Sequence, residues 1–214
     1  MSAHAESFGQ ALAPVGSANE HPPPIHHSSR INPAVLGIIL FIGSEIMLFG
    51  SFFTVYFFDR VVNVQASWPP VGADGQIFER PWFMALINTL ILVTSSFTMH
   101  WATVACKRGN RAGLCAGMVL TVLLGLTFLL TQMVEYHRIG FNTSDTAFAA
   151  TFFGLTGLHG VHVFIGLLIL LGMTVRAFRG HFSPEQHTGL EVGGIYWHFV
   201  DVMWIVVFVT VYVL

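Results

Sequence analysis

The last apolar stretch of the sequence carries two ionisable side chains where a bilayer would hold hydrocarbon. His198 and Asp201 lie three residues apart within the segment 196–204, YWHFVDVMW. Side chains at this spacing share one face of a helix, and Trp197 and Trp204 lie on the same face. Ionisable groups are costly in contact with lipid, so this face must turn toward protein. The segment therefore predicts a contact surface with a partner.

Glu45 is a second acidic side chain inside an apolar stretch. It lies near the middle of the first stretch, with no basic residue within a helical turn. An isolated charge there would cost several kcal/mol, so we expect a protonated carboxyl or a hydrogen bond to a neighbouring helix. Two interpretations remain open. Glu45 either takes part in proton movement or lipid head-group contact, or it only holds two helices together.

Two histidines also share a helical face. His159 and His162 are three residues apart in the segment 157–163, GLHGVHV. Such a pair is able to bind zinc or copper, but a metal site needs at least three ligands and a supporting second shell. Gly157, Gly160 and Gly166 predict close helix packing, which favours interhelical hydrogen bonding over metal binding.

The composition is that of a membrane protein. Hydrophobic residues make up 54% of the 214 residues and charged residues only 9%. A net charge of −2 offers no large basic field, so we expect no nucleic-acid partner. Cys106 and Cys115 form no CxxC or CxxCH pattern, which argues against a disulfide framework, an iron–sulfur cluster or attached c-type haem.

Five apolar stretches are long enough to cross about 30 Å of hydrocarbon at 1.5 Å per residue. They run from Val35 to Phe58, Trp82 to Ala105, Ala112 to Val134, Thr151 to Ala177 and Val192 to Leu214. The predicted fold is an all-α integral membrane protein, a five-transmembrane-helix bundle. Residues 33–214 form this domain and residues 1–32 a flexible cytoplasmic tail.

The tail contains His21, His26 and His27, which could bind a metal, but we favour a solvated tail without one. Basic residues predict the orientation of the bundle. The tail and the second and fourth loops carry six of them, and the first and third loops carry three. By the positive-inside rule, we expect a multi-pass protein of the plasma (inner) membrane, with the N-terminus cytoplasmic and the C-terminus at the outer face.

No helix predicts a catalytic or redox centre. A bundle that carries two haems tends to need histidines about two-thirds of a span apart on one helix, and no stretch has them. We therefore predict no catalytic, cofactor-binding or metal-ligating residue in this chain. A metal- or haem-binding membrane enzyme remains as an alternative of another class.

An ordered set of motifs covers nearly everything after residue 35. In chain order they are LFIGSE at 40–45, WPP at 68–70, NT at 88–89 with WA at 101–102, EYH at 135–137 through TFF at 151–153, GLHGVHV at 157–163 and YWHFVDVMW at 196–204. With this set the chain resembles subunit III of the haem-copper respiratory oxidases, most of all that of cytochrome c oxidase. The subunit III of quinol oxidases, also built from five helices, is the alternative within the superfamily.

The resemblance implies an accessory subunit of a complex that oxidises cytochrome c, reduces oxygen to water and pumps protons. It implies no cofactor in this chain, with haem and copper in the catalytic subunit I against which it packs. Other oxidase subunits, membrane phospholipids and a respiratory supercomplex are the further partners that it implies. The buried polar set for lipid or subunit contact is Glu45, His159, His162, Trp197, His198, Asp201 and Trp204.

The sequence departs from this family in two ways. Larger members have seven helices with a lipid cleft between the first two and the remaining five, whereas this chain resembles the last five. The cleft is then incomplete or finished by another chain. Some members also carry a carboxylate at the start of the helix with the Asn-Thr motif. Phe83 stands near that position here, and Glu79 is the nearest acid.

Overall fold

The computed structural model describes residues 32–62, 82–139 and 143–214. They form five long helices, each of which is long and apolar enough to cross a membrane. The helices are α1 (Pro33–Val62), α2 (Trp82–Lys107), α3 (Arg111–Arg138), α4 (Ala147–Phe178) and α5 (Thr188–Phe208), and α5 continues into the π-helical turn η2 (Val209–Val213). The predicted fold class is confirmed, because the five apolar stretches coincide with these helices.

Local signals explain where the helices begin. Pro33 opens α1, where its missing N–H costs nothing, and the Asn32 side chain accepts a hydrogen bond from the Ala34 N–H at 3.0 Å. The side chains of Asn110 and Thr146 cap α3 and α4 in the same way. Gly109, with a φ of 71°, forms the tight turn between α2 and α3.

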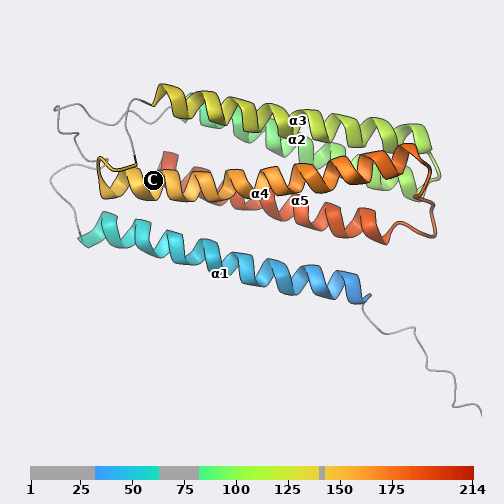
Figure 1. Cartoon of the computed structure of the whole chain (residues 1–214), viewed down its shortest axis with the longest axis horizontal. Coiled ribbons are helices and arrows are strands. Elements are labelled where there is room, and N and C mark those ends of the chain that lie inside the picture. The colour runs from blue at the N-terminus through green and yellow to red at the C-terminus, as the bar shows by residue number, and fades with distance from the viewer. Residues whose placement is uncertain (1–31, 63–81, 140–142) are drawn as a thin grey trace, which may run out of the picture. The chain divides into compact units, whose positions relative to one another are not determined.

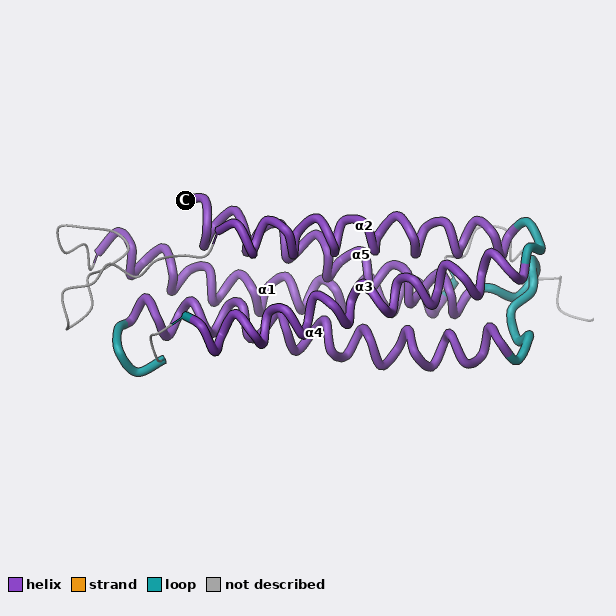
Figure 2. The backbone as a smooth tube through the Cα atoms, turned by 90° about the horizontal axis from the view of Figure 1, so that it is seen from above, coloured by secondary structure: helices purple, strands orange, loops and turns teal. Residues whose placement is uncertain are grey.

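Four of the helices surround a common core. α2 packs against α3 and α5, and α4 also packs against α3 and α5. α1 lies outside this group and contacts only α4 and α5 among the helices with extensive contacts (Figure 1). Figure 2 shows the five helices running alongside one another, with the C-terminus beyond α5. Most of α1 is consequently exposed, and its buried residues are Phe49, Tyr56 and Asp59.

Trp197 is the centre of the core. Its side chain is fully buried and lies in a notch made by two glycines of different helices. A Cβ atom at Gly125 of α3 would lie 2.6 Å from the indole, and one at Gly166 of α4 would lie 2.9 Å from it. Close packing at Gly166 is therefore as predicted. The prediction is wrong for Gly157 and Gly160, because a Cβ there would have no atom of the described residues within 4 Å.

Candidate functional site

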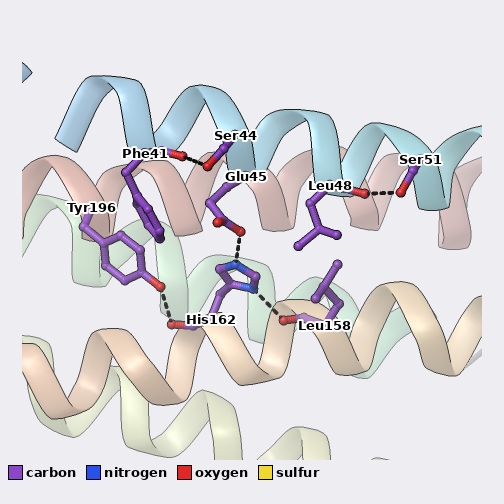
Figure 3. Close-up of polar contacts among 8 residues, drawn as sticks. All are labelled: Phe41, Ser44, Glu45, Leu48, Ser51, Leu158, His162 and Tyr196. Atoms are coloured by element: carbon purple, nitrogen blue, oxygen red, sulfur yellow. Dashed lines mark hydrogen bonds and ion pairs between the residues drawn. The ribbon is translucent and has the colours of Figure 1, made fainter. Parts of the chain in front are cut away.

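Glu45 and His162 form a polar pair between α1 and α4. The Glu45 Oε2 lies 2.8 Å from the His162 Nε2, and both side chains are largely shielded, with 15% and 8% of their surface exposed. The other ring nitrogen, Nδ1, lies 2.8 Å from the carbonyl oxygen of Leu158 (Figure 3). A carbonyl only accepts hydrogen bonds, so Nδ1 carries a proton and donates it.

This arrangement determines how many protons the pair holds. With Nδ1 protonated, the contact between Nε2 and Glu45 needs one further proton, located on either the carboxyl or the imidazole. The pair is then either two neutral groups or an ion pair, and its net charge is zero in both states. A zero net charge reduces the cost of placing these groups inside a membrane span. The same geometry is able to move one proton between the two side chains without other change.

The pair lies in the wall of a cleft of about 510 Å³ between α1, α4 and α5. Most of the other wall residues are apolar, among them Ile38 and Phe41 of α1, Ile165 and Met173 of α4, and Val192 of α5. Tyr196 of α5 also lines the cleft, and its hydroxyl donates to the His162 carbonyl at 3.3 Å. The cleft is therefore mostly apolar, with one carboxyl–imidazole pair in its wall, and this combination suits an amphipathic ligand.

His159 does not line this cleft and instead faces α3 and α5. It is fully buried, and its ring lies 5.7 Å from Phe128 of α3 and 4.8 Å from Trp204 of α5, measured between ring centroids. Neither ring nitrogen has a hydrogen-bond partner among the described residues. His159 and His162 thus point to different helices. No group of three His, Cys, Asp or Glu side chains suited to a metal occurs in the described part of the chain.

The face of α5 with both tryptophans packs against α2 of the same chain. The Trp197 indole donates to the Ser95 hydroxyl at 3.0 Å, and the Trp204 indole donates to Thr89 at 3.0 Å. These bonds hold both rings in the interior. The contact surface predicted for this face is in this part an internal one, between two helices of one bundle.

The same interface between α2 and α5, called the seam below, contains His198 and Asp201. Ser96 Oγ lies 2.5 Å from His198 Nδ1. Asp201 is 4% exposed and faces Ser96, but its oxygens make no hydrogen bond of normal geometry with the described residues. His198 is half-buried, and its position places it at the outer edge of the seam. The seam thus joins a buried carboxyl, a hydroxyl and a partly accessible imidazole.

A further buried polar contact, not predicted from the sequence, lies near the C-terminus. Tyr212, in the π-helical turn, donates to the Glu135 carboxyl at 3.2 Å, and both residues are buried. Gln132, one turn before Glu135, is also buried, and its side-chain atoms lack hydrogen bonds to the described residues. The spacing of Gln132 and Glu135 on one face of an apolar helix was the signal that could have identified them.

Several predictions fall outside the described residues. They concern the tail with His21, His26 and His27, and the first loop with its WPP motif at 68–70 and Glu79. Phe83, near the position where some related proteins carry a carboxylate, is exposed in the first turn of α2.

Comparison with known proteins places these motifs in a family. The family model described as "Cytochrome c oxidase subunit III" matches residues 23–214. A cytochrome c oxidase subunit 3 from Thermostichus vulcanus is 40% identical over 215 aligned residues, which cover 100% of this chain and 98% of that protein. The Drosophila melanogaster subunit is 40% identical over 82% of this chain and 67% of its own length. The Loxodonta africana subunit is 37% identical over 87% of this chain and 72% of its own length.

Proposed function

Because the chain belongs to the cytochrome c oxidase subunit III family, we propose that it is a non-catalytic membrane subunit of a terminal oxidase that oxidises cytochrome c, reduces oxygen to water and pumps protons. The family match over residues 23–214 carries this proposal. In this role the haem and copper belong to the catalytic subunit, and this chain packs against that subunit. A quinol oxidase is not favoured, since the relatives are named cytochrome c oxidase subunit 3.

The cleft beside α1 is proposed to hold a phospholipid. Its apolar walls fit an acyl chain, and Thr188 and Gly189, at the beginning of α5, also line it. The backbone N–H groups at a helix N-terminus favour an anionic group, such as a lipid phosphate. The Glu45–His162 pair then lies beside the acyl chain, deeper in the span, where its hydrogen bond holds α1 against α4.

We also propose an orientation for the bundle, which its charged ends support. Lys107, Arg108 and Arg111 lie at the turn between α2 and α3, and Arg176 and Arg179 lie at the end of α4. These helix ends lie on the side of the bundle where α1 begins (Figure 1). The positive-inside rule supports a cytoplasmic location for this side in a plasma membrane, with the C-terminus at the outer face.

Purification of the oxidase from native membranes tests the proposed function. We expect the chain to co-purify with a large subunit that carries haem and copper, and to bind no stoichiometric metal itself. Oxidase purified from cells that lack this chain should retain its haem spectrum but lose activity sooner during turnover. A haem bound to the isolated chain, or its recovery without other oxidase subunits, would contradict the proposal.

A substitution that fills the cleft tests lipid binding. Ile38→Trp places a large ring among the cleft walls, whereas Leu40→Trp places the same ring on the outward face of α1, where Leu40 is 67% exposed. Native mass spectrometry of the oxidase should show loss of bound phospholipid for Ile38→Trp and retention for the matched control Leu40→Trp. Equal lipid content in both variants would refute a lipid in this cleft.

A further inference from the structure

Two imidazoles lie near each other where α2 meets α5, because Ser96, which contacts His198, is one helical turn from His100. His100 of α2 is exposed, His198 of α5 is half-buried, and the two are close enough to interact electrostatically. Lys107 and Glu191 form an ion pair 2.7 Å apart, so these two residues lie at the same height along α2 and α5, at the ends proposed to be cytoplasmic. His100 and His198 are each seven residues from this ion pair. At 1.5 Å per residue, both lie about 10 Å deeper in the membrane.

The hydrogen-bonding capacity of these rings is only partly used. Ser96 occupies the Nδ1 of His198. Among the described residues, none makes a hydrogen bond to the Nε2 of His198 or to either nitrogen of His100. Whichever tautomer His198 adopts, its Nε2 is left as one donor or one acceptor.

Other outward-facing polar side chains in the spans differ from this pair. Their hydroxyls donate to backbone carbonyls of their own helices, three or four residues earlier, and therefore need no partner in the surrounding lipid. These hydroxyls belong to Ser44, Ser51, Thr54, Thr94 and Thr127. His100 and the Nε2 of His198 make no such bond to a described backbone carbonyl, and acyl chains neither donate nor accept hydrogen bonds.

We propose that the surface of α2 and α5 around His100 and His198 is the docking face for another subunit of the oxidase. The partner is a transmembrane helix with a hydrogen-bonding side chain, such as a hydroxyl, amide or carboxyl, opposite the two imidazoles. Phe97 and Val202, which are 70% and 57% exposed on the same surface, provide the apolar contact around this polar centre. The inference rests on the proposed function, since it assumes that the chain assembles with other oxidase subunits.

Site-specific photo-crosslinking in the intact oxidase tests this face. A photoreactive phenylalanine analogue replaces Phe97 or Val202, and the matched control positions are Leu123 and Leu130 on α3, each 54% exposed. After irradiation, mass spectrometry identifies the crosslinked product. We expect covalent adducts with another oxidase subunit from positions 97 and 202. We expect no such adducts from the control positions 123 and 130. Lipid adducts alone at 97 and 202, or subunit adducts from α3 instead, would overturn the proposal.

A substitution at His100 provides an independent readout. His100 has no hydrogen bond to the described residues and is exposed, so His100→Leu leaves the bundle's own contacts intact. We expect this variant to dissociate from the oxidase at a lower detergent concentration than the unmodified chain. His137→Leu, at the exposed end of α3, is the control and should dissociate at the same detergent concentration as the unmodified chain. Unchanged retention of His100→Leu would contradict the docking face.

The two possible failures are distinguishable. If the unmodified chain does not co-purify with any oxidase subunit, the proposed function itself is wrong. If it co-purifies but the crosslinks arise only from α3, the function stands and the docking face is wrong.

Discussion

The cleft beside α1 and the seam between α2 and α5 each hold a histidine near a carboxyl inside the membrane span, but the two histidines are bonded differently. His162 uses both ring nitrogens within the chain, one toward Glu45 and one toward the Leu158 carbonyl. His198 uses one nitrogen for Ser96, and the neighbouring Asp201 carboxyl makes no hydrogen bond of normal geometry with the described residues.

This difference separates a finished polar contact from an unfinished one. A pair whose hydrogen bonds are all made within the chain joins two helices and needs no further hydrogen-bond partner from its surroundings. A ring that is half-satisfied at the edge of a bundle indicates that something outside the chain supplies the other bond. The self-contained pair is consistent with the proposed role of the cleft in attaching α1, and the unused imidazole nitrogen supports the proposed docking face at the seam.

The largest effect is expected where the seam enters the core. In Gly125→Ala the new Cβ would lie 2.6 Å from the Trp197 ring, so the indole or the helix must shift. We expect this overpacking to lower the free energy of unfolding by about 3 kcal/mol. The measurement is the thermal unfolding of the chain in detergent micelles, followed by tryptophan fluorescence.

Gly157→Ala is the control for this prediction, because a Cβ there meets no atom of the described part of the chain within 4 Å. It should be neutral or stabilise the helix by up to about 1 kcal/mol. Equal melting temperatures for the two alanine variants would mean that Trp197 is not held in a tight notch.

A smaller effect is expected at the cleft. Glu45→Leu leaves the His162 Nε2 shielded and without its partner, which should cost about 2 kcal/mol. Because α1 contacts only one side of the bundle, the loss should appear as faster hydrogen–deuterium exchange in α1 than in α3. Glu45→Gln retains an amide that can donate to Nε2, so its exchange pattern should match that of the unmodified chain. Rapid degradation of Glu45→Gln would instead indicate an ionised pair that requires the carboxylate.

The smallest effect is expected at the hydroxyl of the seam. Ser96→Ala removes the partner of the His198 Nδ1 and should cost about 1 kcal/mol of unfolding free energy. Ser44→Ala removes a hydroxyl that bonds only to its own helix, at the Phe41 carbonyl, and should change stability by less. If thermal unfolding ranks the two variants in the opposite order, the contact between Ser96 and His198 contributes nothing to the seam.

Much of the bundle was predictable because its signals are local. α1 to α4 each cover their predicted apolar stretch, and α5 with η2 covers the fifth as far as Val213. The motif set predicted the family, which the match over residues 23–214 confirms. The partners of His159 and His162 were not predictable, because their spacing places both on one side of α4 without saying which neighbouring helix each will meet. The Glu135–Tyr212 contact, across 77 residues, was missed for the same reason.

The amino-acid sequence alone determined the number, length and apolar character of the membrane helices, since hydropathy and helix-capping residues act within a few turns of chain. It also determined that several ionisable groups must be buried. Only the tertiary structure decided which of those groups are satisfied, because Glu45 finds His162 across 117 residues and Ser96 finds His198 across 102. The physical reason is that a hydrogen bond between helices depends on how the helices pack, and packing is a property of the whole bundle.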